Sequence, residues 1–153
     1  MALSNDARLL AIGGLLSAGV ALLHAAVAFV GAGAYRYLGA GERMAVRAER
    51  GDPGPAIITA GLTVMFAVWS AYAFSGAGLL PPLPWLRASL IAIGSVYTLR
   101  GLVLFPQVFL TLSGRQAVPL RYLFFSAMSL LIGVAYLAGS RMIWEAMPGK
   151  SAG

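Results

Sequence analysis

The chain has 153 residues, of which 59% are hydrophobic and 10% are charged, and its formal net charge is +6. Soluble domains are about 25% charged, so this composition excludes an ordinary soluble globular protein and predicts a membrane protein. The absence of cysteine and the single histidine exclude disulfides, thiolate catalysis, iron–sulfur ligation and a haem held by paired histidines.

Charged residues are segregated along the chain, and four long stretches carry almost no charge. A helix needs about 20 apolar residues to cross a bilayer core. The stretches therefore predict four spans, at about residues 8–33, 55–75, 84–105 and 120–143. We expect one all-α transmembrane domain over residues 1–153, an integral membrane four-helix bundle with an interfacial connection between helices 1 and 2.

The first predicted span carries a seam of small residues and the only histidine. Gly13, Ser17, Ala21 and Ala25 recur at four-residue spacing, which favours close packing against another helix. His24 has two interpretations. It is either a proton-responsive or ligand-binding group, or a neutral imidazole hydrogen-bonded to a Ser, Thr or Tyr of a neighbouring helix.

The next two connections differ in kind. The segment "ERMAVRAER" (42–50) has no helix breaker and predicts about two helical turns at the headgroup level, ended by "GDP" (51–53). The segment "SGAGLLPPLP" (75–84) predicts a compact turn, because its prolines cannot continue a helix.

The third predicted span contains Arg100 within "YTLRGLVLF" (97–105), and a charge at the centre of a span costs about 3 kcal/mol. If the helix ends near Pro106, Arg100 lies about 9 Å from that end. It then either snorkels to the interface or pairs with an acid of the first connection, Glu42 before Glu49. If the helix continues to about Thr111, Arg100 lies deep, which favours a ligand-binding role.

Small and polar residues also follow one side of the second and fourth spans. We interpret them as packing surfaces, with a substrate path as the alternative. They are Thr59, Thr63 and Ser70 in the second span, and Ser126, Ser129, Gly133, Tyr136 and Ser140 in the fourth.

An even number of spans places both termini on one side of the membrane. The opposite side carries more basic residues, so the positive-inside rule predicts both termini outside. The basic residues are Arg36, Arg43, Arg47, Arg50, Arg115 and Arg121 on the side of the connections, and Arg8, Arg87, Arg141 and Lys150 on the terminal side.

A candidate ligand-binding site is predicted where polar residues share one side and a similar depth. We expect these residues to converge under the first connection. No catalytic constellation, metal-ligand cluster or cofactor motif is visible in the sequence. The candidate site residues are His24, Tyr35, Arg36, Glu42, Tyr97 and Arg100.

Three strings, "HAAVAFVGAGAYRYLGAGERMA", "AVWSAYAFSGAGLL" and "YTLRGLVLFP", resemble a group of small, uncharacterised four-span proteins of the bacterial inner membrane. The resemblance covers most of residues 20–106. It implies a topology and a multi-pass location in the bacterial inner membrane, and it assigns no activity.

Two functional hypotheses follow. The first is a non-enzymatic accessory or interaction protein, which associates with itself or with a partner membrane protein through the Gly13–Ala25 or Ser126–Ser140 surface. The second is a small-molecule or lipid-headgroup binder or transporter that uses Arg100 and His24. Arg100 satisfied by Glu42 or by snorkelling favours the first, and water access to Arg100 favours the second.

A membrane enzyme ranks last, because no catalytic constellation is visible. The basic residues flank the spans, so the expected partner is the lipid bilayer rather than nucleic acid.

Overall fold

The computed structural model describes residues 3–141, which form seven helices. Four helical segments within this range are long and apolar enough to cross a membrane: α1, α4, α5 together with α6, and α7. The predicted all-α fold with four membrane spans is therefore confirmed. The helices are α1 (Asn5–Val30), α2 (Ala32–Leu38), α3 (Glu42–Glu49), α4 (Gly54–Gly76), α5 (Leu86–Leu102), α6 (Leu104–Leu112) and α7 (Leu120–Gly139). The end of the fourth predicted span, residues 142–143, and Lys150 lie outside the described residues.

The first connection is helical and begins earlier than predicted. Gly31 has a φ of +78°, a backbone conformation that side-chain-bearing residues rarely adopt, and it ends α1 at Val30 instead of near residue 33. The chain turns there into the short helix α2. The helix predicted within residues 42–50 is confirmed as α3, which follows directly.

The third span is longer than predicted, because the chain remains helical beyond Pro106. Proline has no N–H and its ring clashes with the carbonyl four residues earlier, which is that of Leu102. The helix is interrupted at this point, so α5 ends at Leu102 and α6 begins at Leu104. Together they form an apolar segment of 27 residues.

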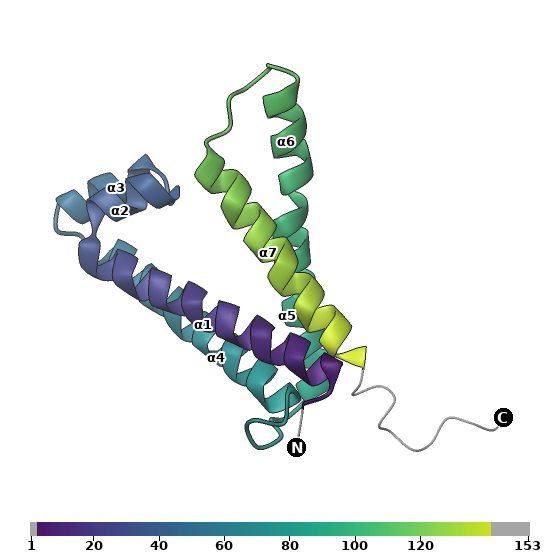
Figure 1. The fold of residues 1–153 in the computed structure, drawn as a ribbon. Helices are drawn as coiled ribbons and strands as arrows, with labels where there is room; N and C mark the ends of the chain where they lie inside the picture. Colours follow the sequence, from purple (N-terminus) through teal and green to yellow (C-terminus); the bar gives the residue numbers. More distant parts are fainter. Residues whose placement is uncertain (1–2, 142–153) are drawn as a thin grey trace, which may run out of the picture.

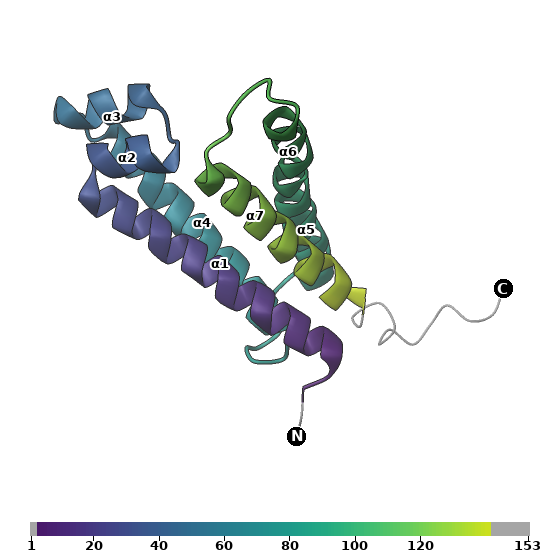
Figure 2. The ribbon, with the colours of Figure 1, turned by 45° about the horizontal axis from the view of Figure 1, so that its top comes forward.

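The spans are arranged as two helix pairs that form a V (Figure 1). One pair is α1 with α4, and the other is α5 with α7. The pairs meet where α1 begins and α7 ends, and they diverge toward α2, α3 and α6, as the tilted view also shows (Figure 2). At the closed end, Leu10 of α1 packs against Gly139 of α7.

The seams of small residues pack against other helices of the same chain. Gly13, Ser17 and Ala21 of α1 are buried, and Gly13 lies against the ring of Tyr136. On α7, Ser126, Gly133, Tyr136 and Ser140 are buried as well. These surfaces hold the chain's own helices together, so most of each surface is not open to a second copy.

Candidate functional site

A network of hydroxyl groups joins all four spans at the base of the V. Tyr97 OH of α5 donates to Ser17 Oγ of α1 at 3.2 Å, and Ser17 Oγ lies 2.9 Å from Tyr136 OH of α7. Tyr136 OH donates to the carbonyl of Trp69 in α4 at 2.8 Å. The only hydroxyl proton of Tyr136 is donated to the carbonyl of Trp69. Ser17 is therefore the donor to Tyr136, and each hydroxyl of the network donates once. This satisfied, buried chain locks the helices together, since unpaired polar groups are costly in lipid.

The ring of Phe66 lies between His24 and this network. His24 Nδ1 donates to the carbonyl of Val20 in its own helix at 2.8 Å, and the His24 ring lies 4.9 Å from the ring of Phe66 in α4. The Phe66 ring is 6.1 Å from the ring of Tyr97. The expected hydrogen bond from His24 to a Ser, Thr or Tyr of another helix is absent from the described residues, so Nε2 has no hydrogen-bond partner there.

Three of the candidate residues belong to the α2–α3 connection. Tyr35 is buried, and its hydroxyl lies 3.3 Å from Thr59 Oγ1 of α4. Arg36 binds the carboxylates of both Glu42 and Glu49, at 2.7 Å and 2.5 Å. These hydrogen bonds lower the pKa of both carboxyl groups and raise that of Arg36. Glu42 and Glu49 therefore pair with Arg36. Contrary to the prediction, neither of them pairs with Arg100.

Arg100 lies well inside the apolar segment. It is about 18 Å along the helix from Leu112, and its partner Ser126 is about 9 Å from the start of α7, at the helical rise per residue. Arg100 Nη1 donates to Ser126 Oγ at 3.0 Å, and Ser126 Oγ donates to Gln107 Oε1 at 2.8 Å. Although Ser126 is buried, Arg100 itself is exposed. No carboxylate among residues 3–141 pairs with it.

The six predicted site residues thus fall into three groups. Tyr35, Arg36 and Glu42 lie on the α2–α3 connection. His24 of α1 and Tyr97 of α5 flank Phe66 of α4. Arg100 lies one turn beyond Tyr97 on α5 and bonds to α7. Within residues 3–141, no hydrogen bond or ring contact joins one group to another.

A further polar contact, not predicted from the sequence as a site, lies where α2 approaches α7. The guanidinium of Arg121 lies 5.1 Å from the ring centre of Tyr37 and 4.9 Å from that of Tyr122. In the sequence analysis, Arg121 counted only as one of the basic residues on the side of the connections. The sequence signal is a basic residue beside aromatic residues in both "YRY" (35–37) and "RY" (121–122), but a contact between segments so far apart cannot be read from that signal.

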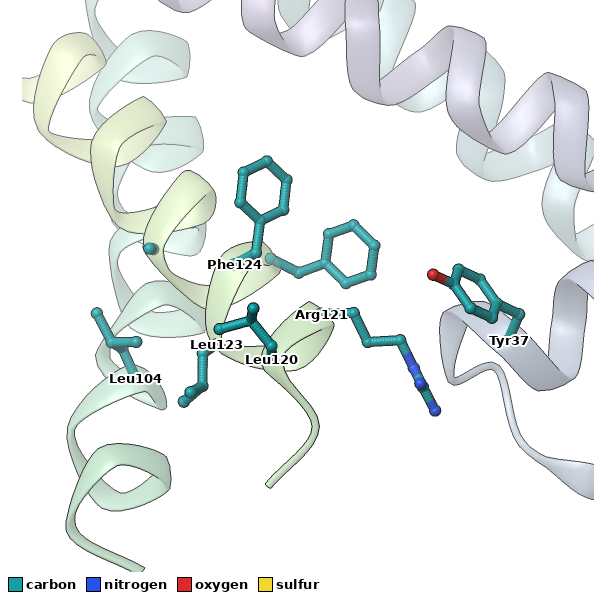
Figure 3. A pocket seen from close by; sticks show the side chains of 8 residues that line it. Tyr37, Leu104, Leu120, Arg121, Leu123 and Phe124 are labelled. Atoms are coloured by element: carbon teal, nitrogen blue, oxygen red, sulfur yellow. The ribbon is translucent and has the colours of Figure 1, made fainter. Parts of the chain in front are cut away.

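This contact borders an open hollow of about 830 Å³ around the first turns of α7. Figure 3 shows Tyr37 and Arg121 on one side of the first turns of α7, with Leu104 and Leu123 on the other. The lining is otherwise apolar. It consists of Tyr37, Leu104, Leu120, Arg121, Leu123, Phe124, Phe125 and Ala127.

Within residues 3–141, no group of three or more His, Cys, Asp or Glu side chains is placed to hold a metal ion. A scan of protein families gives no match, and comparisons with curated proteins and with solved structures give none either. The chain is therefore described by its topology, a multi-span membrane protein with four candidate spans, and no family is assigned to it.

Proposed function

We propose that this protein is a non-enzymatic membrane protein that binds an anionic amphiphile between its two helix pairs, with Arg100 as the anchor of the anionic group. The observation that carries the proposal is the state of Arg100. It is a permanently charged group within an apolar segment, it is exposed, and no carboxylate of the described residues neutralises it.

The surroundings of Arg100 supply hydrogen-bond donors. Since Ser126 donates its proton to Gln107, it can only accept from Arg100. The guanidinium has five N–H donors and uses one of them here, and the carboxamide of Gln107 has two more. A donor-rich, acceptor-poor group of this kind suits a phosphate or carboxylate.

The position of Arg100 also favours a ligand that enters from the side. Arg100 follows Ile93 and Tyr97 on one face of α5, and these two residues belong to the core cluster that includes Ala73 and Ala77 of α4. Arg100 follows these residues toward the end of α5 that leads into α6. The helix pairs diverge in the direction of α6 (Figure 1). An amphiphile can place its charged group at Arg100 while its chain remains among the apolar side chains.

The second hypothesis, an accessory or interaction protein, predicts a different occupant of the same place. A partner helix with an Asp or Glu would neutralise Arg100 and exclude water. The absence of an internal acid at Arg100 is compatible with both occupants, so the experiment must measure water access and ligand protection at this position.

The test uses the cysteine-free chain with a single His24→Cys substitution, which places a thiol beside Phe66, in the last third of α1. We expect a hydrophilic maleimide to label position 24 in membranes, and dodecyl phosphate to slow the labelling while dodecyl maltoside does not. Adding Arg100→Gln removes the protection, and adding Arg43→Gln, an exposed arginine of α3, leaves it unchanged.

Two outcomes would overturn this function. In the first, the cysteine at position 24 does not react with the maleimide while a control cysteine at position 113, in place of Ser113, does. This result would support the accessory-protein hypothesis. In the second, protection is equal with and without Arg100, which removes the proposed anchor.

We also propose a bacterial inner membrane with both termini outside. The location rests on the resemblance of residues 20–106, and the orientation rests on the charge count. Of the basic residues on the α2–α3 side, Arg36 lies on α2, and Arg43 and Arg47 lie on α3. Arg50 directly follows α3, Arg115 follows α6, and Arg121 lies in the first turn of α7. Labelling of single cysteines at Ser4 and Ser113 in intact cells tests the orientation, because only position 4 should react from outside.

A further inference from the structure

We infer that Arg121, held between Tyr37 and Tyr122, anchors a second binding site at the membrane edge, and that this site takes the phosphate group of an anionic phospholipid between α2 and α7. The inference concerns a different residue and a different contact from those at Arg100, and it does not depend on the proposed function.

The first argument is that the guanidinium is oriented but its donors are unused. Two tyrosine rings lie at 5.1 Å and 4.9 Å from Arg121 Cζ. Such stacking fixes the plane of the cation and leaves the N–H groups at its edge. Nε is buried without a hydrogen-bond partner, and no hydrogen bond from Arg121 to residues 3–141 is formed.

The second argument is the charge around this group. The described lining of the hollow contains no carboxylate. The acids of the nearby connection are already used, since Glu42 and Glu49 bind Arg36, and Asp52 binds Arg47 at 2.7 Å. Arg121 therefore has no anionic partner among residues 3–141, and a phosphate oxygen pair matches the fork of its N–H groups.

The third argument concerns the source of the phosphate. Free phosphate and a lipid headgroup share the chemistry that Arg121 recognises. The remaining lining, from Leu104 of α6 to Leu120, Leu123 and Phe124 of α7, is apolar and suits an acyl chain (Figure 3). A hollow lined by a cation and by leucine side chains favours the lipid.

A lipid at this position would stabilise the contact between the two helix pairs. Gly39, at the end of α2, lies so close to the ring of Tyr122 that an added Cβ would be 2.7 Å from its Cε1 atom. Arg121, Tyr37 and Tyr122 thus join α2 to α7 at the end where the pairs diverge. The bound phosphate would complete this junction.

The experiment counts phospholipids on the purified full chain. The protein in dodecyl maltoside is titrated with dioleoyl phosphatidylglycerol and analysed by native mass spectrometry. The matched control is Arg115→Gln, because Arg115 lies on the same side of the protein and over the ring of Phe109 at 5.8 Å, but does not line the hollow. Arg121→Lys is a second variant, which keeps the charge and therefore favours correct folding.

We expect Arg121→Gln to retain one phosphatidylglycerol fewer than the wild type, and Arg115→Gln to retain as many as the wild type. Arg121→Lys should bind it about tenfold more weakly, because an ammonium group cannot make the bidentate contact. Equal retention by Arg121→Gln and the wild type would overturn the inference, and so would an equal loss in Arg115→Gln. Displacement of the lipid by millimolar inorganic phosphate would assign the site to free phosphate instead.

Discussion

Arg100 and Ser126 form a hydrogen bond across the interface of α5 and α7, with 3.0 Å between Nη1 and Oγ. Ser126 is fully buried, and it passes its own proton to Gln107 of α6. One small hydroxyl therefore links three helices and positions a cation within the apolar segment. This contact explains how the chain accommodates Arg100 without an acidic partner in the described residues.

Ser126→Ala is expected to destabilise the protein by about 2 kcal/mol, because hydrogen bonds to charged groups contribute more than neutral ones. The substitution leaves Arg100 Nη1 and Gln107 Oε1 without their common partner. Thermal unfolding in detergent measures the change. Ser129→Ala is the control, since Ser129 bonds only to the carbonyl of Phe125 in its own helix, and its loss should change stability by less than about 0.5 kcal/mol. Equal effects of the two substitutions would contradict the linking role of Ser126.

A close backbone approach between α5 and α7 leads to a second prediction. Gly101 lies against Leu130, and a Cβ added at Gly101 would be 2.5 Å from Leu130 Cα. Since backbone cannot move aside as a side chain can, Gly101→Ala should cost about 1–3 kcal/mol, as overpacking does. Gly19→Ala is the matched control, because a Cβ at Gly19 meets nothing within 4 Å and the residue is helical. The control should be neutral or slightly stabilising, since alanine is the better helix former.

The hydroxyl network at the base of the V gives a third prediction. Tyr136→Phe removes the group that donates to Trp69 and accepts from Ser17, so two buried polar groups lose their partner. We expect a loss of about 1–3 kcal/mol, the range for a buried group left unsatisfied. Tyr72→Phe is the comparison, because Tyr72 OH donates to Pro84 at the protein surface, where water can replace it. A result in which Tyr72→Phe is the more damaging variant would refute the role of the network.

The spans could be predicted because the length of an uncharged stretch can be read directly from the sequence. The helix α3 was predictable for a similar reason, since the end of the breaker-free segment coincides with Gly51 and Pro53. The continuation beyond Pro106 was left open, because a proline that ends a helix and one that only interrupts it have the same local sequence.

The site could be predicted only in part, because it depends on which helices are neighbours. Glu42 and Arg36 are six residues apart, yet the sequence predicted Glu42 as the partner of Arg100. The turn at Gly39, which brings α3 back along α2, is a three-dimensional feature. The Arg121 contact with Tyr37 joins residues from opposite halves of the chain. In lipid, packing decides such contacts, and a hydropathy pattern does not specify packing.

The α2–α3 connection should respond to acid. Arg36 lowers the pKa of Glu42 and Glu49 below the ordinary value near 4.5, mainly by hydrogen bonding. A carboxyl whose pKa is lowered on folding adds stability that is present above its ordinary pKa and is lost as the pH falls through the lowered one. The connection should therefore stay folded from neutral pH to about pH 4.5, and loosen only under more acidic conditions.

Hydrogen exchange of the amides in α2 and α3, measured as a function of pH after correction for the intrinsic exchange rate, tests this expectation. In the wild type, protection should fall only below about pH 4.5, because protonation of Glu42 or Glu49 leaves Arg36 with fewer acceptors. The Glu42→Gln/Glu49→Gln variant should have lower protection already at neutral pH and a much weaker pH dependence. Asp52 is held by Arg47 in the same way and its pKa is also lowered, so the residual dependence of that variant should disappear with Asp52→Asn. Loss of protection already near pH 6 would contradict this expectation, because both carboxyl groups are ionised there.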